Sequence, residues 1–531
     1  MKKFFPLLAL PFVLTALPAR PARAAATDIV PEGSVLRDAF AALARTDAFG
    51  AEETPEDFLG STLYTRGQLA RMLTHLVQDD PKRLAAVQQE EASEAALHAA
   101  IEDLQPELKA DGVDLNDADP LPPTSTVSVS GYVQPELRVR VGGDSQLKTG
   151  VIGIYRVTAL GNVRPNLRYA LSASNWPEDG RRVFDNDKGP HDFSGINEAY
   201  LTLDGGRGLE VNLGRMYNRW GPGTRGATMI SDNAPALDQL QVRFPFSLGA
   251  RFGRSYSFTQ FLSTFKESGV QKYLAGRRIE YAFNPRLSAD FQESYKSSSS
   301  QSLYVSLLPD FYTGQSANLK IGGLRIQGLD QTYNSFLNFG LAYAATPDLR
   351  VYGQLGIDDI QTPGHRTYRT PRKIAQLLGV AFQPQAGTGV VAEYTFADAT
   401  TYSSRIVDTQ WQKGQYDELG LPSGPNSREF FLRLSRRLRP GLTVALQGRD
   451  RRRRDDSFPE PTSRDLAASV EFAPSRSTAL EVTFHDYRQD AFPIPSSVLS
   501  PGDGFTPANA EGDYGQTLRI KQLDVDYRFF F

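Results

Sequence analysis

Five arginines lie within six consecutive positions in the C-terminal part of the chain: Arg449, Arg451, Arg452, Arg453 and Arg454. They follow a long alternating segment, so we expect them in an outer loop. A guanidinium is planar and binds a carboxylate through two parallel hydrogen bonds, which predicts binding to an acidic sugar polymer. Two other interpretations fit the cluster equally well. It is a solvated loop partly neutralised by Asp450, Asp455 and Asp456, or it contacts lipopolysaccharide phosphates.

Aromatic side chains in the long polar segments offer flat faces on which sugar rings stack. They are Tyr368, Tyr402, Trp411 and Tyr416. The aromatic girdles of membrane barrels explain the same residues. Both interpretations stay open at this point.

Catalytic chemistry has little support in the sequence. The 531 residues include no cysteine, which excludes disulfides, zinc–cysteine sites and a thiol nucleophile. The five histidines are far apart: His75, His98, His191, His365 and His485. None lies in an HExxH motif, and no G-x-S-x-G elbow is present. We therefore expect a protein that is not an enzyme and holds no cofactor or metal. The alternative is an outer-membrane lipase or deacylase whose serine and histidine come from distant strands.

The N-terminal segment has the layout of a secretory signal peptide. Lys2 and Lys3 precede an apolar run from Phe4 to Ala19, and small residues follow at Ala22 and Ala24. A charged, then apolar, then small-residue order predicts that residues 1–24 direct export.

Residues 28–110 form a small helical domain by their pattern, with Leu36, Phe40 and Leu43 at helical spacing. Residues 25–120 contain 20 acidic and 7 basic side chains, whereas residues 121–531 carry a net charge of +6. The segment 111–125 is rich in Asp and Pro, which is typical of a linker. We expect an acidic periplasmic domain on a tether.

Residues 64–73 within that domain resemble helices of S-layer-homology modules, which bind cell-wall polymers in other proteins. A capped helix, with Thr65 as N-cap and Gln68 three residues later, explains the same residues and is the preferred interpretation. A cell-wall polymer such as peptidoglycan is the partner that the resemblance implies.

The pattern changes to strict alternation from Thr126 onward. Apolar residues occupy every second position from Val127 to Val141, and polar residues lie between most of them. Such a strand is long enough to cross a bilayer at a tilt. The last residues, 523–531, alternate in the same way and end in phenylalanine. They resemble the C-terminal insertion signal of outer-membrane barrels, which implies the barrel-assembly machinery as a partner.

Turns and loops alternate along the rest of the chain. Short turns are expected at 284–286, 346–348 and 439–441, whereas polar connections such as 175–195 and 487–515 are long. This asymmetry is typical of outer-membrane barrels. About 405 residues at roughly 22 per strand predict about 18 strands. The fold class is therefore mainly β: a transmembrane antiparallel β-barrel over 126–531, with a small N-terminal α-helical domain.

Three separated segments share a pattern with one family. Residues 198–246 contain Trp220-Gly-Pro-Gly and Ser231-Asp-Asn-Ala-Pro between strands. Residues 274–278 and 351–358 agree as well. In this order, the segments resemble the Wzi capsule-assembly family of outer-membrane proteins. The resemblance implies an 18-stranded barrel that acts as a lectin-like anchor for capsular or other surface polysaccharide.

The candidate polysaccharide ligands are Arg219, Trp220 and Arg225 together with the arginine cluster. The remaining motif residues are expected to be structural: Gly221, Pro222, Gly223, Ser231, Asn233, Ala234 and Pro235. In the preferred interpretation the glycines permit positive φ and Trp220 lies at the membrane interface. The other partners implied are outer-membrane lipid and surface polysaccharide, with no nucleic acid. The alternative function is a diffusion porin with a periplasmic domain that contacts the cell wall.

Overall fold

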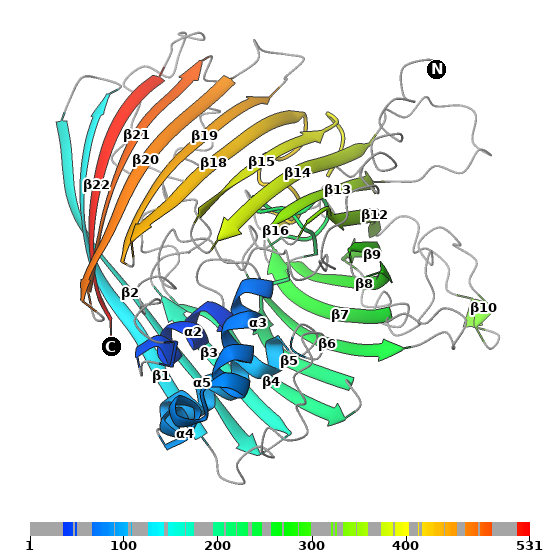
Figure 1. The fold of residues 1–531 in the computed structure, drawn as a ribbon. Helices are drawn as coiled ribbons and strands as arrows, with labels where there is room; N and C mark the ends of the chain where they lie inside the picture. Colours follow the sequence, from blue (N-terminus) through cyan, green and yellow to red (C-terminus); the bar gives the residue numbers. More distant parts are fainter. Residues whose placement is uncertain are drawn as a thin grey trace.

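The computed structural model of the chain contains a β-barrel with short helices at one end (Figure 1). It describes residues 35–45, 48–49, 66–89, 91–104, 108, 126–142, 147–164, 166–174, 195–206, 209–218, 220–231, 236–246, 256–267, 270–284, 286–298, 320–321, 324–325, 333–346, 348–358, 373–385, 388–402, 412–413, 417–439, 441–453, 462–475, 478–490 and 518–530. The expected signal peptide and linker lie outside these residues.

Eighteen strands form one antiparallel sheet. They are β1 (Thr126–Gly142), β2 (Leu147–Arg164), β3 (Leu167–Ser174), β4 (Gly195–Gly206), β5 (Leu209–Met216), β6 (Leu237–Phe246), β7 (Tyr256–Glu267), β8 (Val270–Asn284), β9 (Leu287–Ser297), β12 (Tyr333–Ala344), β13 (Leu349–Asp358), β14 (Ile374–Gln385), β15 (Thr388–Ala397), β18 (Ser427–Arg439), β19 (Leu442–Arg453), β20 (Thr462–Ser475), β21 (Thr478–Asp490) and β22 (Leu518–Phe530). Two small hairpins also occur: β10 (Lys320–Ile321) with β11 (Leu324–Arg325), and β16 (Gln412–Lys413) with β17 (Asp417–Glu418).

The sheet closes on itself because the first strand, β1, pairs both with its neighbour β2 and with the last strand, β22. Val133 lies opposite Tyr155 of β2 on one side and opposite Phe529 of β22 on the other. A closed sheet has no unpaired edge. The predicted barrel of about 18 strands is confirmed.

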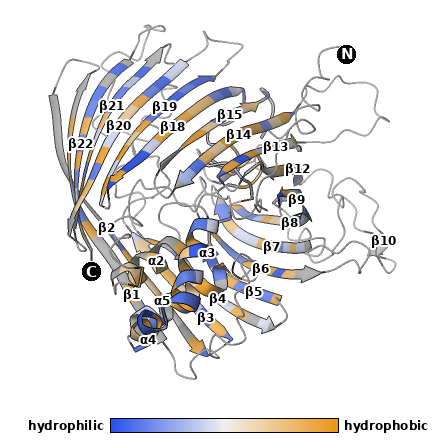
Figure 2. Cartoon of the chain, viewed as in Figure 1, coloured by the Kyte–Doolittle hydropathy of each residue, from blue (hydrophilic) through white to orange (hydrophobic). Residues whose placement is uncertain are grey.

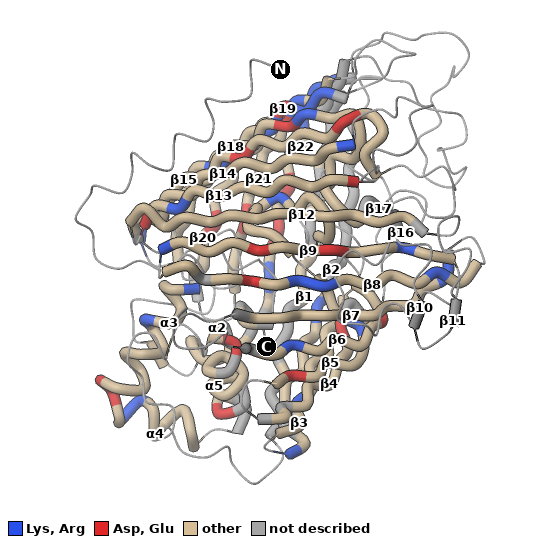
Figure 3. Tube along the Cα trace, turned by 90° about the vertical axis from the view of Figure 1, so that its right-hand side faces the viewer, with Lys and Arg blue, Asp and Glu red and all other residues tan. Residues whose placement is uncertain are grey.

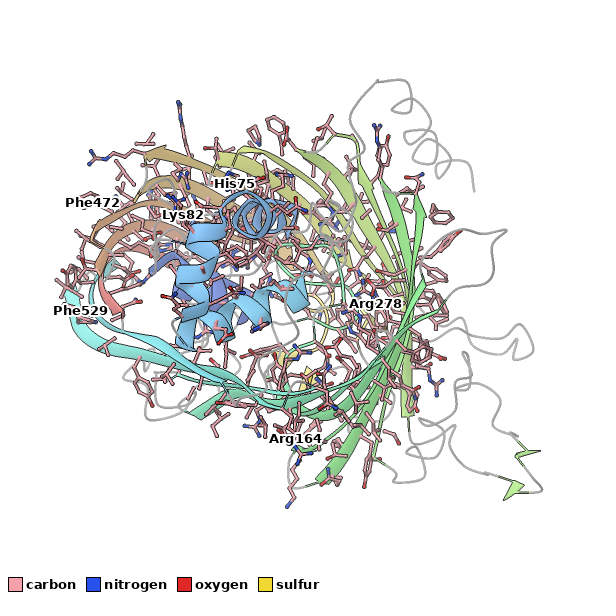
Figure 4. All side chains as sticks on the ribbon, turned by 60° about the horizontal axis from the view of Figure 1, so that its bottom comes forward. His75, Lys82, Arg164, Arg278, Phe472 and Phe529 are labelled. Carbon is pink, nitrogen blue, oxygen red and sulfur yellow. The ribbon has the colours of Figure 1, made fainter. Side chains whose placement is uncertain are left out.

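Alternating side chains separate the outside of the barrel from its interior, the lumen. Many outward positions are apolar and exposed, as at Leu466 (58%) and Leu446 (51%). Figure 2 shows hydrophobic and hydrophilic residues alternating along the strands, and in Figure 4 Phe472 and Phe529 point away from the barrel. The period of two residues is what makes one face apolar and the other polar.

Short turns join the strands at one end of the barrel, here called the short-turn end. The Asn284 side-chain oxygen accepts hydrogen bonds from the backbone N–H groups of Arg286 (2.8 Å) and Leu287 (2.9 Å) and so fixes the β8–β9 turn. At the β18–β19 turn, Gly441 has a φ of 70°, which glycine adopts without strain. The turns expected at these positions are confirmed.

Helices α2 (Val35–Arg45), α3 (Arg66–Thr74), α4 (Pro81–Gln89) and α5 (Glu91–Asp103), with the π-helix η5 (His75–Asp79), all lie within the predicted helical segment. Arg66 of α3 binds Asp103 of α5, with 3.0 Å between Nη1 and Oδ1. None of the helices in the described part of the chain is long and apolar enough to span a membrane.

The helices pack against the inner wall of the barrel near the short-turn end. Their buried apolar side chains form one cluster with Leu160 of β2 and Ala170 of β3, and Tyr200 of β4 packs against it. Leu160 lies opposite Ala170, and Ala170 lies opposite Tyr200, so the three form one row across the wall. Figure 4 shows the helices within the ring of strands. We call these helices the helical plug, and the row of wall residues beneath them the apolar row.

Candidate functional site

The connection between β5 and β6 folds into the lumen. We call its described residues, 217–218 and 220–231, the inserted loop. Trp220 is only 4% exposed, and its ring meets that of Phe261 edge to face with 5.1 Å between centroids. The N–H of Trp220 donates to the carbonyl of Ile230 (3.0 Å), which closes the loop on itself. The expected position of Trp220 at the membrane interface is therefore wrong, because the chain turns inward after β5 ends.

Glycines allow the inserted loop to approach the wall closely. A Cβ on Gly276 of β8 would lie 2.8 Å from the Trp220 ring, and one on Gly221 would lie 2.5 Å from the Gln354 side chain. A Cβ on Gly223 would meet the Gly226 carbonyl at 2.4 Å. Gly221 and Gly223 are not among the positive-φ residues. The motif thus needs these glycines for space and not, as expected, for positive φ.

Three side-chain amides of the wall hold the inserted loop, two through its backbone and one through the Thr228 hydroxyl. The Trp220 carbonyl accepts from Gln292 Nε2 (3.0 Å) and Gln354 Nε2 (2.8 Å). Gln354 Oε1 in turn accepts from the Thr228 N–H (3.0 Å). Asn338 joins the two sides, accepting from Thr228 Oγ1 (2.6 Å) and donating to Gln292 (3.0 Å). Backbone groups removed from water are satisfied here by β9 and β13.

Glu393 of β15 holds the next part of the inserted loop. Its carboxylate accepts from the backbone N–H groups of Thr224 and Arg225 (3.0 Å to the latter) and from the Tyr352 hydroxyl (2.6 Å). The Arg225 guanidinium lies 5.4 Å from the centre of the Phe431 ring, and its Nε is 3.8 Å from Glu429 Oε1. Arg225 is therefore tied to the wall on several sides.

A second connection, between β15 and β18, packs on the inserted loop. The Tyr402 hydroxyl donates to the Thr228 carbonyl (2.7 Å) and accepts from the Leu421 N–H (3.1 Å). Its ring stacks on Phe336 at 5.6 Å, and its backbone has a φ of 68°. At 2% exposure Tyr402 has no face open to a sugar ring, so the stacking role expected for it is wrong. The expected sites at Tyr368, Trp411 and Tyr416 lie outside the described residues.

The three segments that carry the family resemblance meet at this site. Trp220 packs over Gly276 of the second segment, and its carbonyl binds Gln354 of the third. Asp358, which ends the third segment, accepts from the Tyr402 N–H (2.7 Å). The segments are far apart in the sequence, and only the closed barrel places them in contact.

The outer loop expected for the arginine cluster is wrong for Arg449 to Arg453, because these residues belong to β19, which continues to Arg453. Arg449 (9% exposed) faces inward opposite Asp465 of β20, and Arg451 Nη2 donates to the Ser423 carbonyl (2.6 Å). Arg452 faces outward with Asp450. Adjacent residues of a strand point to opposite faces, so the cluster divides between the two sides of the wall.

The other predicted site residues are placed only in part. The N–H of Ser231 donates to the Leu419 carbonyl (2.8 Å), and Pro222 lies half-buried in the inserted loop. Arg219, Asn233, Ala234, Pro235 and Arg454 lie outside the described residues.

The inner face of β20–β22 carries a charged group that was not among the predicted site residues. His485 lies between two carboxylates, with Nδ1 3.4 Å from Asp465 and Nε2 3.8 Å from Asp524. Gln522 also donates to Asp524 (2.8 and 2.9 Å). The sequence held a signal for this group: alternate residues of a strand share a face, so counting from the apolar outward positions places these side chains on the inner face. No group of three or more His, Asp or Glu among the described residues is placed to hold a metal ion.

Comparison with solved structures identifies the fold. Wzi of Escherichia coli, an outer-membrane protein involved in group 1 capsule assembly and described as a carbohydrate-binding β-barrel, matches with a TM-score of 0.50 and 13% identity. The match covers 94% of this chain and 99% of Wzi. The chain thus has the fold of an outer-membrane β-barrel.

Weaker matches are to other barrels. OpdL of Pseudomonas aeruginosa has a TM-score of 0.40 and 12% identity, over 76% of this chain and 99% of OpdL. An anion-selective porin of Comamonas acidovorans has a TM-score of 0.36 and 12% identity, over 77% of this chain and 100% of the porin. No family model and no curated protein matches the chain.

Proposed function

We propose that this protein binds a surface polysaccharide at the outer membrane and holds it at the cell face during capsule or envelope assembly. The observation that carries the proposal is the inserted loop, which Gln292, Gln354 and Glu393 bind to the lumen wall. A diffusion channel needs an unobstructed lumen, whereas a binding scaffold needs rigid elements that position its ligand groups.

The helical plug supports the same proposal from the other end of the lumen. In this arrangement the short-turn end faces the periplasm and the exported chain is inserted by the barrel-assembly machinery. The helices then lie on the periplasmic side, where they are close enough to contact a cell-wall polymer such as peptidoglycan. The polysaccharide is bound from the long-loop end, and binding involves no bond-breaking chemistry. The similarity to Wzi supports this assignment through the fold alone.

Deleting the gene and measuring polymer in cell and medium fractions tests the proposal. We expect polymer to move from the cell surface into the medium, and the purified full-length protein to bind the isolated polymer. Cell-attached polymer that stays at the wild-type level would contradict the proposal.

Planar-bilayer recordings separate the anchor from the diffusion porin. We expect little conductance from the wild-type protein. Glu393→Ala, which removes the acceptor for two loop N–H groups, should produce larger and fluctuating currents. Thr395→Ala is the matched control, because Thr395 is buried on the same face of β15. A wide, steady conductance from the wild-type protein would favour the porin.

A further inference from the structure

The outward face of β18–β22 changes from apolar to basic towards the long-loop end. In the apolar band, Phe430, Leu466, Phe484 and Leu523 face outward. The outward positions just beyond them hold six basic residues: Arg428, Arg452, Arg464, Arg488, Arg519 and Lys521. We call these six residues the basic belt. Figure 3 shows basic residues gathered along β19 at the top of that view.

The strand register brings like charges of the basic belt together. Arg428 lies directly opposite Arg452, and Arg488 lies opposite Arg464 on one side and Arg519 on the other. Like charges in such positions destabilise a sheet unless anions compensate them. The side chains remain largely exposed: 55% for Arg452, 59% for Arg464 and 63% for Arg519.

Among the described side chains of this face, two carboxylates compensate part of this charge. Asp450 is shared by Arg452 (3.5 Å) and Arg464 (3.6 Å), and Asp486 binds Arg519 (3.3 Å). The six basic residues and these two carboxylates therefore have a net charge of +4.

Two arginines at outward positions elsewhere in the described wall each have a carboxylate partner. Arg215 of β5 binds Asp238 of β6 through two contacts of 2.7 and 2.9 Å. Arg277 of β8 lies opposite Glu293 of β9, 3.5 Å away, and both side chains are buried. The basic belt differs from these pairs, because its six basic residues lie beside only two carboxylates among the described side chains.

We propose that the basic belt binds the phosphate groups of lipopolysaccharide, the phosphorylated glycolipid of the outer leaflet. A guanidinium fits phosphate through paired, charge-assisted hydrogen bonds. The apolar band directly beneath the belt contacts acyl chains, so one amphiphilic molecule satisfies both surfaces. Free phosphate has no acyl chain to place there. The proposal rests on the long-loop end facing the cell exterior, as in the proposed function, but not on polysaccharide binding.

Purified full-length protein in detergent is the material for the test, with lipid A as the probe and native mass spectrometry as the readout. The triple variant R464Q/R488Q/R519Q removes three charges from the belt. The control R164Q/R436Q/R439Q removes three exposed charges near the short-turn end. We expect at least ten-fold weaker lipid A binding for the belt variant and wild-type binding for the control.

Dephosphorylated lipid A identifies the group that is recognised. It should bind the wild-type protein as weakly as lipid A binds the belt variant, and high salt should weaken only the phosphorylated probe. Heat-modifiable gel mobility confirms that each variant is folded. Equal binding of lipid A to the belt variant and the wild type overturns the proposal, as does equal loss in the control. Binding of isolated polysaccharide is measured on the same protein samples. If the protein binds lipid A but not the polysaccharide, only the proposed function is contradicted.

Discussion

The inserted loop and the helical plug both occupy the lumen, but different interactions hold them. Wall side chains bind the loop through its backbone: Gln292 and Gln354 at Trp220, and Glu393 at Thr224 and Arg225. The plug meets the wall through an apolar row of Leu160 and Ala170.

Backbone chemistry explains the difference. A helix satisfies most of its own N–H and carbonyl groups, so it needs only an apolar surface on which to dock. An irregular segment does not, and its buried backbone groups require polar partners from the wall. The polar groups of the wall therefore fix one path for the loop backbone. The apolar row, in contrast, allows the helices to dock in more than one orientation.

The largest effect is expected from Glu393→Ala. The substitution leaves the Thr224 and Arg225 N–H groups and the Tyr352 hydroxyl without their acceptor in a buried site. Each unsatisfied buried group costs about 1–3 kcal/mol, so we expect a loss of about 4 kcal/mol in unfolding free energy. Chemical denaturation in detergent measures this loss. A change no larger than that of Thr395→Ala would show that the loop is not held by its backbone.

Leu160→Ala should loosen the helical plug while leaving the barrel intact. Truncating a buried leucine costs about 2–5 kcal/mol, and here we expect a value near the lower end because the site lies at an interface. Faster hydrogen exchange in residues 91–103 is the measurement. Leu171→Ala, at an outward position of β3, is the control. Unchanged exchange would mean that contacts other than the apolar row hold the helices.

Gly276→Ala tests the packing of the inserted loop as distinct from its hydrogen bonds. The new methyl would lie 2.5 Å from the Phe261 ring and 2.8 Å from the Trp220 ring, so overpacking should cost about 1–3 kcal/mol. Trp220→Leu in the same chain should recover part of that loss, which a double-mutant cycle measures. The control is Gly448→Ala, where the nearest atom belongs to the Leu466 side chain at 3.3 Å. Additive effects would argue against contact between Trp220 and β8.

The smallest effect concerns pH and the helical plug. Burial lowers the pKa of His98 in α5 below its ordinary value of 6.5. The folded helix thus favours neutral His98, so its contribution to stability is full above pH 6.5 and is lost as pH falls through the lowered pKa. We expect hydrogen exchange in α5 to accelerate on acidification, and His98→Gln to remove that response. His75→Gln, at an exposed position, should keep it; the reverse result would assign the response to His75.

Several features of the fold could be predicted because they depend on local pattern. The alternation from Val127 to Val141 identified the outward face, and turns such as 284–286 identified the strand ends. Successive side chains of a strand point to opposite faces, so the alternation in the sequence shows directly which residues face outward. The same alternation, continued along β19, places Arg449 inward and Arg452 outward. The run of charged residues had instead suggested a loop.

Contacts between distant segments could not be predicted in this way. Trp220 and Gln354 are 134 residues apart, yet one hydrogen bond joins them inside the barrel. The short motif around Trp220 fits a strand end at the membrane as well as it fits a loop in the lumen. The residues of the wall decide between the two, since they supply the amides and the carboxylate that a buried loop requires.

The sequence by itself therefore determined a closed barrel of about 18 strands, its two faces and its helical N-terminal segment. Only the tertiary structure decided which segments enter the lumen and that the arginines divide between the two faces of β19. The physical reason is that alternation is a local property of the chain. Satisfying buried backbone groups, in contrast, requires side chains that only the closed sheet brings together.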